Sequence, residues 1–248
     1  MRFLTYPISL LSGILLLAIS SPASADDDTL HIHMISGSKE YKSKEALTAW
    51  AQSLNENYAN VRFTATWADD AGNDLPEIES LGDADLMLVF ARRINVPDDQ
   101  LAYIRDHIEA EKPVLGIRTA SHAFQTYLEL DAKVFGGDYD GHGNDEPTKV
   151  SIVEGDEDHA IVAGLEPWER KGKIYHNPNL GPNTQTLLRV AGQNSGIDEP
   201  AAWTNRFGEK GRAFYTSMGR HDDFENEFFL ALLLNAVEWT TERKLVPR

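Results

Sequence analysis

The stretch KPVLGIRTASHAFQ, residues 112–125, decides the fold of this chain. Its short apolar run, VLGI, follows Pro113 and stops at Arg118, and small residues then lead into a helix-like segment that begins near Ser121. This pattern is typical of a buried parallel strand that ends in a tight turn at the carboxyl edge of a sheet, where open α/β folds bind ligands. Enzymes with a nucleophile elbow place Ser or Cys at this turn, whereas Arg118 is permanently cationic and a poor nucleophile.

Strand and helix patterns on both sides of this turn predict an α/β chain. Apolar runs of strand length occur at 30–35, 61–67, 84–90, 149–153, 173–176, 186–190, 201–206 and 212–217. Helix-like segments begin at Ser43, a predicted N-cap, at Pro97, and at Phe224. The strand–helix alternation of the first half predicts a mostly parallel sheet with helices on both faces. Residues 135–146 are rich in Gly and Asp, which predicts a long ordered loop.

The first 25 residues have the features of a secretory signal peptide. Arg2 precedes an apolar run at 8–19, and Ala23-Ser24-Ala25 forms a cleavage pattern of small residues. The apolar run is shorter than the roughly 20 residues that a membrane-spanning helix needs. We therefore expect a secreted or periplasmic protein with no stable membrane insertion after the signal is removed. The expected divisions are a signal peptide at 1–25, one domain at 26–243 and a C-terminal tail at 244–248, whose LVPR is either native or a cloning remnant.

Composition excludes several partners and chemistries. The formal net charge of −16 argues against nucleic acid as a partner. The sequence has no Cys, so disulfides, thiol catalysis and thiolate metal sites are excluded. The glycine patterns of nucleotide-binding loops are also missing, and we expect no cofactor. The sequence does not exclude a homo-oligomer.

Three segments resemble the ThuA-like (trehalose-utilisation) family of the class I glutamine amidotransferase-like superfamily. They are GIRTASH at 116–122, DHAIVAGL at 158–165, and GRAFYTSMGRH at 211–221 with NAVEW at 235–239. The likeness extends from about residue 31 to 239. It implies a flavodoxin-like three-layer sandwich with a mostly parallel central sheet and a link to sugar metabolism.

The same resemblance argues against glutamine hydrolysis. Amidotransferases of this superfamily have a Cys at the elbow and a His near the C-terminus. Here Arg118 occupies the Cys position and Ala120 replaces a Gly, while His221 near the His position is followed by Asp222-Asp223. The resemblance therefore implies a ThuA-like protein that is not a glutamine amidotransferase.

Arg118, His122 and His221 are the candidate catalytic residues. The planar guanidinium of Arg118 could hold a carboxylate, a phosphate or a developing oxyanion, or it could pair with an acidic residue of the 135–146 loop. His122 follows four residues later, and His221 follows a strand-like run that would end at the same edge of the sheet. Each histidine could transfer protons or have a structural role. Ser121 is better explained as an N-cap than as a nucleophile, because no Gly-x-Ser-x-Gly surrounds it.

Candidate substrate-binding residues come from three polar segments. The loop at 36–41 lies between a strand and a helix, where anions and sugar hydroxyls can bind. The glycine-containing loop near 139–143 could close over the crevice, and the segment at 175–178 ends a strand-like run with polar side chains. The residues that we assign to substrate binding are Ser36, Glu40, Tyr41, Tyr139, His142, Tyr175 and His176.

These residues support three hypotheses about function. The first is a secreted or periplasmic protein that acts on a small carbohydrate or keto-sugar derivative by acid/base chemistry, as an isomerase, lyase or hydrolase. The second is a carbohydrate-binding protein without catalysis. The third is a metal-dependent hydrolase, suggested by the eight histidines, of which His31 and His33 share one side of a strand. Because no spaced ligand motif occurs, we assign no metal ligand.

Overall fold

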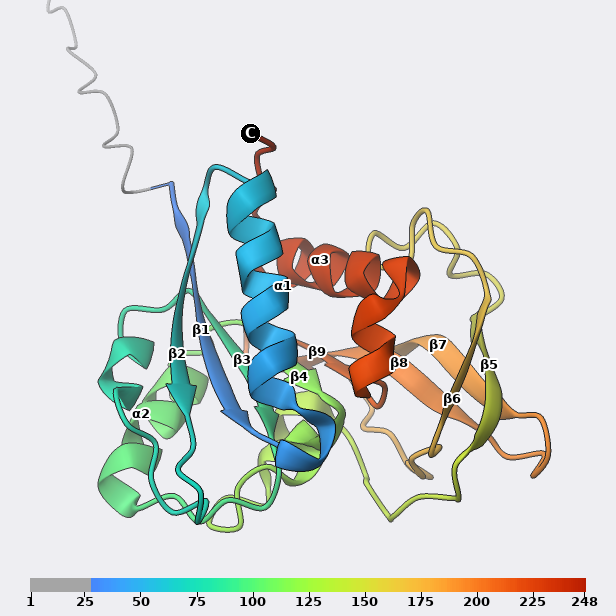
Figure 1. Cartoon of the computed structure of the whole chain (residues 1–248), viewed down its shortest axis with the longest axis horizontal. Helices are drawn as coiled ribbons and strands as arrows, with labels where there is room; N and C mark the ends of the chain where they lie inside the picture. The colour runs from blue at the N-terminus through green and yellow to red at the C-terminus, as the bar shows by residue number, and fades with distance from the viewer. Residues whose placement is uncertain (1–27) are drawn as a thin grey trace, which may run out of the picture.

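A mixed sheet of nine strands forms the centre of residues 28–248, the part of the chain that this computed structural model describes (Figure 1). The strand order is β2-β1-β3-β4-β9-β8-β7-β5-β6. The strands are β1 Leu30–Gly37, β2 Val61–Trp67, β3 Leu86–Ala91, β4 Val114–Ile117, β5 Glu146–Ile152, β6 Trp168–Gly172, β7 Thr184–Gly192, β8 Asp198–Phe207 and β9 Gly211–Thr216. The α-helices are α1 Ser43–Asn57, α2 Asp98–Glu109 and α3 Glu227–Thr241. Short 3₁₀ helices are η1 Lys39–Tyr41, η2 Ile78–Leu81, η3 Arg118–His122 and η5 His221–Glu225, and η4 Asp131–Phe135 is a π-helical turn.

The sheet has a parallel half and an antiparallel half. Neighbouring strands from β2 through β1, β3 and β4 to β9 run parallel. Strands β9, β8, β7, β5 and β6 pair antiparallel. The predicted parallel core is confirmed where strands alternate with helices, and the second half is antiparallel because loops without α-helices connect its strands.

Helices cover both faces of the parallel half, and each face has its own apolar core (Figure 1). On one face, α1 lies over β1 and β2 and α3 lies over β4 and β9, and Leu47, Phe229 and Ile32 belong to the same core. On the other face, α2 packs Ile104 against Val89 of β3. Successive strand residues point to opposite faces, which is why a continuous apolar run such as β3 supplies both cores. The predicted three-layer α/β sandwich is confirmed.

Gly116 in β4 is required by close packing at the centre of the sheet. A Cβ atom at this position would lie 2.5 Å from Cζ of Phe135 and 3.0 Å from Cδ2 of Tyr215. Because both rings are buried and have little room to move, we expect Gly116→Ala to lower the free energy of unfolding by about 2–3 kcal/mol. Urea denaturation would measure the change.

The control for this prediction is Gly143→Ala. A Cβ atom at Gly143 would be at an ordinary contact distance, 3.4 Å from Cδ1 of Ile197. This variant should stay within about 0.5 kcal/mol of the original protein. Equal stabilities for the two variants would show that the sheet relaxes around Gly116.

The structure corrects the prediction that Ser43 is an N-cap. Lys42 is the N-cap of α1, with a left-handed backbone (φ 50°). The Ser43 hydroxyl instead lies 2.7 Å from that of Ser36 and accepts a hydrogen bond from the N–H of Ser38 at 2.9 Å. The side chain therefore stabilises the β1–α1 loop rather than the helix end.

Two other local predictions were wrong. Ser121 is not an N-cap, because residues 118–122 form the 3₁₀ turn η3, whose N-cap is Ile117, and no α-helix lies between η3 and β5. The strand predicted at 173–176 lies earlier, as β6. In β6 only Trp168 and Gly172 at the two ends are buried, so apolar periodicity does not reveal the strand.

The structure describes the C-terminal end of the chain but not residues 1–27. The predicted signal peptide lies outside the described residues. Within residues 28–248, no helix has the length and apolar character needed to cross a membrane. The predicted tail, 244–248, packs against the α1–β2 connection, where the N–H of Arg248 donates to the carbonyl of Asn57 at 2.9 Å and Leu245 is buried.

Candidate functional site

The carboxyl ends of β1, β3 and β4 meet at one edge of the sheet. The chain leaves β1 for β2 on one side and returns to β3 on the other, so the connections diverge between β1 and β3. Open α/β sheets bind ligands at such a divergence, because the separating loops leave a crevice there. The loops after these strands touch, since Thr119 donates to the hydroxyl of Ser38 at 3.2 Å and the N–H of Arg93 donates to the carbonyl of His122 at 3.0 Å.

Arg118 is fully buried where β4 ends, in a left-handed backbone conformation (φ 49°). Its Nη1 donates to the carbonyl of Ser217 at 2.9 Å, and Nη2 donates to the hydroxyl of Tyr41 at 3.3 Å. The guanidinium carbon lies 4.3 Å from the ring centre of Tyr41 and 4.7 Å from that of Tyr175. Two aromatic faces therefore hold this cation, and the predicted alternative, pairing with an acidic residue of the 135–146 loop, does not occur.

Four rings from three distant segments form a cluster beside Arg118. The His122 ring stacks on that of Tyr139, with centroids 4.5 Å apart and planes at 19°. Tyr139 in turn contacts Tyr175 at 4.7 Å, and His142 stacks on Tyr175 at 6.0 Å. The cluster joins three of the predicted substrate-binding residues to a predicted catalytic residue.

His122 has one engaged and one available ring nitrogen. Nδ1 lies 3.0 Å from the hydroxyl of Ser121, whereas Nε2 has no hydrogen-bond partner in residues 28–248. Burial, together with the positive charges of Arg93 and Arg92, lowers the pKa of His122 to about 4. The imidazole is therefore neutral near pH 7, and Nε2 can accept a proton or a hydrogen bond from a ligand.

A buried carboxyl group fixes the loop that carries Tyr139. Oδ2 of Asp131 accepts the N–H of Tyr139 at 3.1 Å, while Oδ1 is buried without a partner. Burial raises the pKa of Asp131 to about 6. A second attachment is the N–H of His176, which donates to the carbonyl of Gly141 at 3.0 Å. The predicted ordered loop is thus held at Tyr139 and at Gly141, next to His142.

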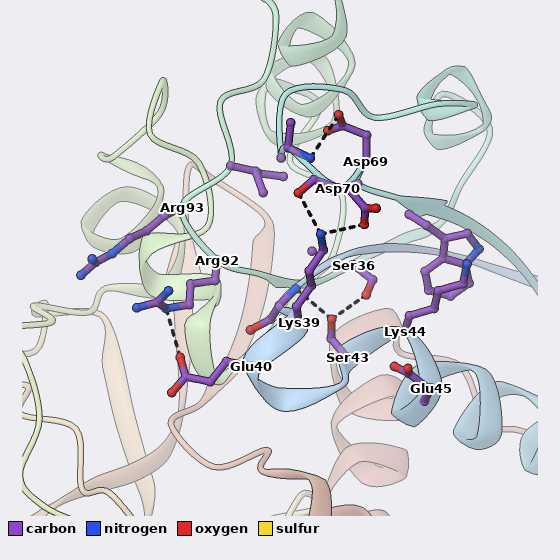
Figure 2. Close-up of a pocket in the computed structure, with 17 residues that line it drawn as sticks. Ser36, Lys39, Glu40, Ser43, Lys44, Glu45, Asp69, Asp70, Arg92 and Arg93 are labelled. Carbon is purple, nitrogen blue, oxygen red and sulfur yellow. Dashed lines mark hydrogen bonds and ion pairs between the residues drawn. The ribbon is translucent and has the colours of Figure 1, made fainter.

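A pocket of about 490 Å³ opens at the carboxyl ends of β1, β2 and β3 (Figure 2). Lys39 contacts Asp70 at 2.7 Å, and Arg92 contacts Glu40 at 3.5 Å. Trp67 also lines the pocket. Its volume is in the range of small-molecule sites, and Arg92 and Arg93 connect it to the cluster around His122.

Of the remaining predicted substrate-binding residues, Ser36 and Glu40 line this pocket and His176 does not. Glu40 lines it, and Ser36 lines it from a buried position. His176 lies next to Tyr175 in sequence, but its Nδ1 contacts Oε1 of Glu199 at 3.1 Å. His176 therefore has a protein partner, whereas the ring nitrogen Nε2 of His122 does not.

The predicted convergence of His221 with Arg118 and His122 is not seen in the described residues. His221 is exposed and lines a separate groove of about 590 Å³ between α1 and α3. Phe224, beside this groove, stacks on Phe90, which stacks on Tyr41. Strands β9 and β4 do end at the same edge, but the turn after β9 carries the chain to the face covered by α1 and α3.

Sequence reasoning missed Arg92 and Arg93. They directly follow the buried strand β3 in the same way that Arg118 directly follows β4. The carboxyl-edge argument applied to Arg118 applies equally to them. The sequence therefore contained a signal for both residues.

No group of three or more His, Cys, Asp or Glu side chains in residues 28–248 could hold a metal ion. His31 and His33 do lie on one side of β1, but Thr64 and Thr66 are their partners. The hydroxyl of Thr64 lies 2.8 Å from a ring nitrogen of each histidine, and that of Thr66 lies 3.0 Å from Nε2 of His33. These histidines are buried parts of the β1–β2 contact.

Known proteins match both the sequence and the fold. The family model for ThuA, described as trehalose utilisation, matches residues 32–240. A ThuA-like protein from Bacteroides uniformis has a TM-score of 0.66 and 17% sequence identity, covering 90% of this chain and 95% of that chain. A ThuA-like protein from Parabacteroides merdae has a TM-score of 0.67 and 18% identity, covering 89% and 92%.

A more distant likeness is to PurLQS from Thermotoga maritima, with a TM-score of 0.51 and 13% identity, covering 85% of this chain and 99% of that chain. At such identities the structural matches show the fold alone. No curated protein sequence matches this chain.

Proposed function

The chain belongs to the ThuA (trehalose utilisation) family, and from this premise we propose that it acts on a small carbohydrate or keto-sugar derivative through acid/base chemistry at His122. The observation that carries the proposal is the ring cluster beside Arg118. Aromatic faces bind the apolar faces of sugar rings, and the half-buried ring of Tyr139 lies next to His122, packed against the buried ring of Tyr175.

His122 would exchange a proton with the ligand through Nε2. Its neutral ring is in the form that can accept a proton, and the contact of Nδ1 with Ser121 fixes the ring orientation. Arg118 contributes positive charge to this site from behind Tyr41 and Tyr175. A fixed positive charge stabilises an oxyanion, such as the one formed when a proton is taken from a carbon next to a carbonyl.

A carbohydrate-binding protein without catalysis is the second candidate. Two observations favour it. The low pKa of His122, about 4 through burial and neighbouring arginines, makes the ring a weak base. His221, the expected second proton-transfer group, lies in a separate groove.

We also propose that the protein is exported, since residues 1–25 have the features of a signal peptide. Detection of the mature chain in the periplasm or the medium after cell fractionation would support this. A full-length chain confined to the cytoplasm would contradict it.

Sugar binding and turnover would test the two candidates together. Calorimetry with mono- and disaccharides and their 3-keto derivatives should detect binding, and we expect Tyr139→Ala to weaken it about tenfold through loss of ring contact. Product formation followed by NMR should fall at least about 100-fold in His122→Ala, since general acid/base groups contribute rates of this order.

The matched control is His221→Ala, which removes an exposed histidine from the groove between α1 and α3. It should leave turnover unchanged. Binding without any turnover by the original protein would favour the second candidate. Equal turnover in all three proteins would remove His122 from the mechanism.

A further inference from the structure

The surroundings of His122 are positively charged, although the whole chain has a net charge of −16. Arg93, Arg92 and Arg118 are the charged residues with the largest influence on this histidine, and all three lower its pKa. The same three arginines act on the neighbouring Tyr139. An acidic protein therefore has a local cationic region at its candidate ligand site.

Arg93 has a guanidinium without an ion pair in residues 28–248. Its backbone is held in a left-handed conformation (φ 52°), and its N–H donates to the carbonyl of His122 at 3.0 Å. Figure 2 shows its exposed side chain extending away from Lys39 and Asp70. A fixed backbone with a free charged end is suited to contact a ligand.

Arg92 is only weakly engaged. Its Nε lies 3.5 Å from Oε2 of Glu40, and the two side chains are 41% and 45% exposed. Such a pair contributes little to stability, so Arg92 can exchange this contact for a ligand group at small cost. Both arginines therefore have donors available at the pocket.

Three of the four acidic residues that line the pocket are occupied by their own neighbours, and the fourth, Glu45, is exposed without an ion pair in residues 28–248. Oδ1 of Asp69 accepts the N–H groups of Asn73 and Asp74 at 2.6 and 3.1 Å. Asp70 pairs with Lys39. These carboxylates, unlike Arg93, already have partners.

Arg118 adds a buried charge that has no direct ion pair in residues 28–248, although the more distant carboxylate of Asp223 acts on it. Its hydrogen-bond acceptors are a carbonyl and a hydroxyl, and its Nε is buried without a partner. A buried cation is stabilised by a nearby anion, and here two aromatic faces are the substitute. An anionic ligand close to the ring cluster would supply the missing negative charge.

Building on the proposed function, we infer that the ligand is an anionic sugar, whose carboxylate or phosphate binds Arg92 and Arg93 while its ring lies against Tyr139. The guanidinium forks of arginine suit both groups, since each offers paired oxygen acceptors. A neutral sugar would leave Arg93 without a partner, and a cationic ligand would be repelled by all three arginines.

Calorimetry with glucose, glucuronate and glucose 6-phosphate would test this inference. We expect at least one of the two anionic sugars to bind about tenfold or more tightly than glucose. Raising the salt concentration should weaken that binding more than glucose binding, because salt screens exposed charges. The tighter of the two anionic sugars identifies the carboxylate or the phosphate as the recognised group.

The Arg93→Gln variant should reduce the affinity for the anionic sugar to about the glucose level. Arg62→Gln is the matched control, because Arg62 is an exposed arginine without an ion pair in residues 28–248, near the opposite, amino-terminal end of β2. Equal affinities for glucose and the anionic sugars, or equal effects of the two variants, would overturn the inference and leave the proposed function intact. Absence of binding by all three sugars and by the sugars screened above would overturn the proposed function itself.

Discussion

The Asp223→Ala variant is expected to lose about 3–5 kcal/mol of folding free energy, because it leaves a buried arginine without its partner. Arg170 donates to Asp223 twice, from Nε at 2.6 Å and Nη2 at 2.7 Å, and the two side chains are only 6% and 4% exposed. Oδ2 of Asp223 also accepts the N–H groups of Gly219 and Arg220 at 2.8 Å each. Burial alone would raise the pKa of Asp223, but the Arg170 charge and these hydrogen bonds hold it below its usual value.

Urea denaturation of Asp223→Ala and Asp222→Ala would isolate this effect. Asp222 is the adjacent, exposed aspartate, and its contact with Arg220 at 3.1 Å is open to solvent. Its removal should cost less than about 1 kcal/mol. If Asp223→Ala does not fold, Asp223→Asn keeps acceptor capacity and gives a smaller loss. A loss below about 1 kcal/mol in Asp223→Ala would contradict the role of this ion pair.

The same ion pair explains why the position of His221 could not be predicted. The sequence shows that a strand ends before Gly219, and this is correct for β9. The direction of the chain after that strand depends on Asp223, which is attached to Arg170 of β6. A contact between the middle of β6 and the 3₁₀ helix η5, 53 residues apart in the chain, leaves no local pattern in the sequence.

Arg118 shows both what local sequence determines and what it does not. An apolar run that stops at a charged residue predicts a buried strand ending there, and β4 ends at Ile117. The hydrogen-bond partners of Arg118 are another matter, since Tyr41 and Ser217 lie 77 and 99 residues away in the chain. They come together only because strand order places β1 and β9 on either side of the β3–β4 pair.

The ring cluster around His122 was also predictable from the sequence only in part. The residue types of Tyr139, His142 and Tyr175 indicated ligand contact, and the structure does place their rings together with His122. Their order within the cluster depends on Asp131, whose carboxyl group fixes the loop from a buried position. A buried carboxyl group in an irregular segment follows no periodic pattern, so the sequence did not reveal it.

The free energy of unfolding is expected to fall by roughly 6 kcal/mol as the pH decreases from about 7 to about 4, because three histidines resist protonation. His33 and His107 are buried and His122 is half-buried, and burial is the main cause that lowers the pKa of each from 6.5 to about 4. In the unfolded chain all three would bind protons near pH 6.5, so their stabilising contribution is complete above that pH. It is lost as the pH falls from 6.5 to about 4, at about 3 kcal/mol for each histidine.

Asp131 opposes this loss. Burial raises its pKa from 3.8 to about 6, so its folded form binds a proton first and its contribution is complete below pH 3.8 and lost as the pH rises through about 6. The gain on acidification is about 3 kcal/mol, which offsets one histidine. The predicted net loss is therefore the difference between three histidines and one carboxyl group.

Two variants should move the pH profile in opposite directions. His107→Gln removes one of the histidines that resist protonation. The unfolding free energy, measured by urea denaturation across this range, should therefore depend less steeply on pH. Asp131→Asn keeps an acceptor for the N–H of Tyr139 but removes the carboxyl group that gains a proton on acidification. The unfolding free energy of this variant should therefore fall more steeply as the pH decreases. His221→Gln, at an exposed position, should leave the slope unchanged. Parallel profiles for all four proteins would show that these buried groups titrate alike in the folded and unfolded chains, and the electrostatic account of the core would then be wrong.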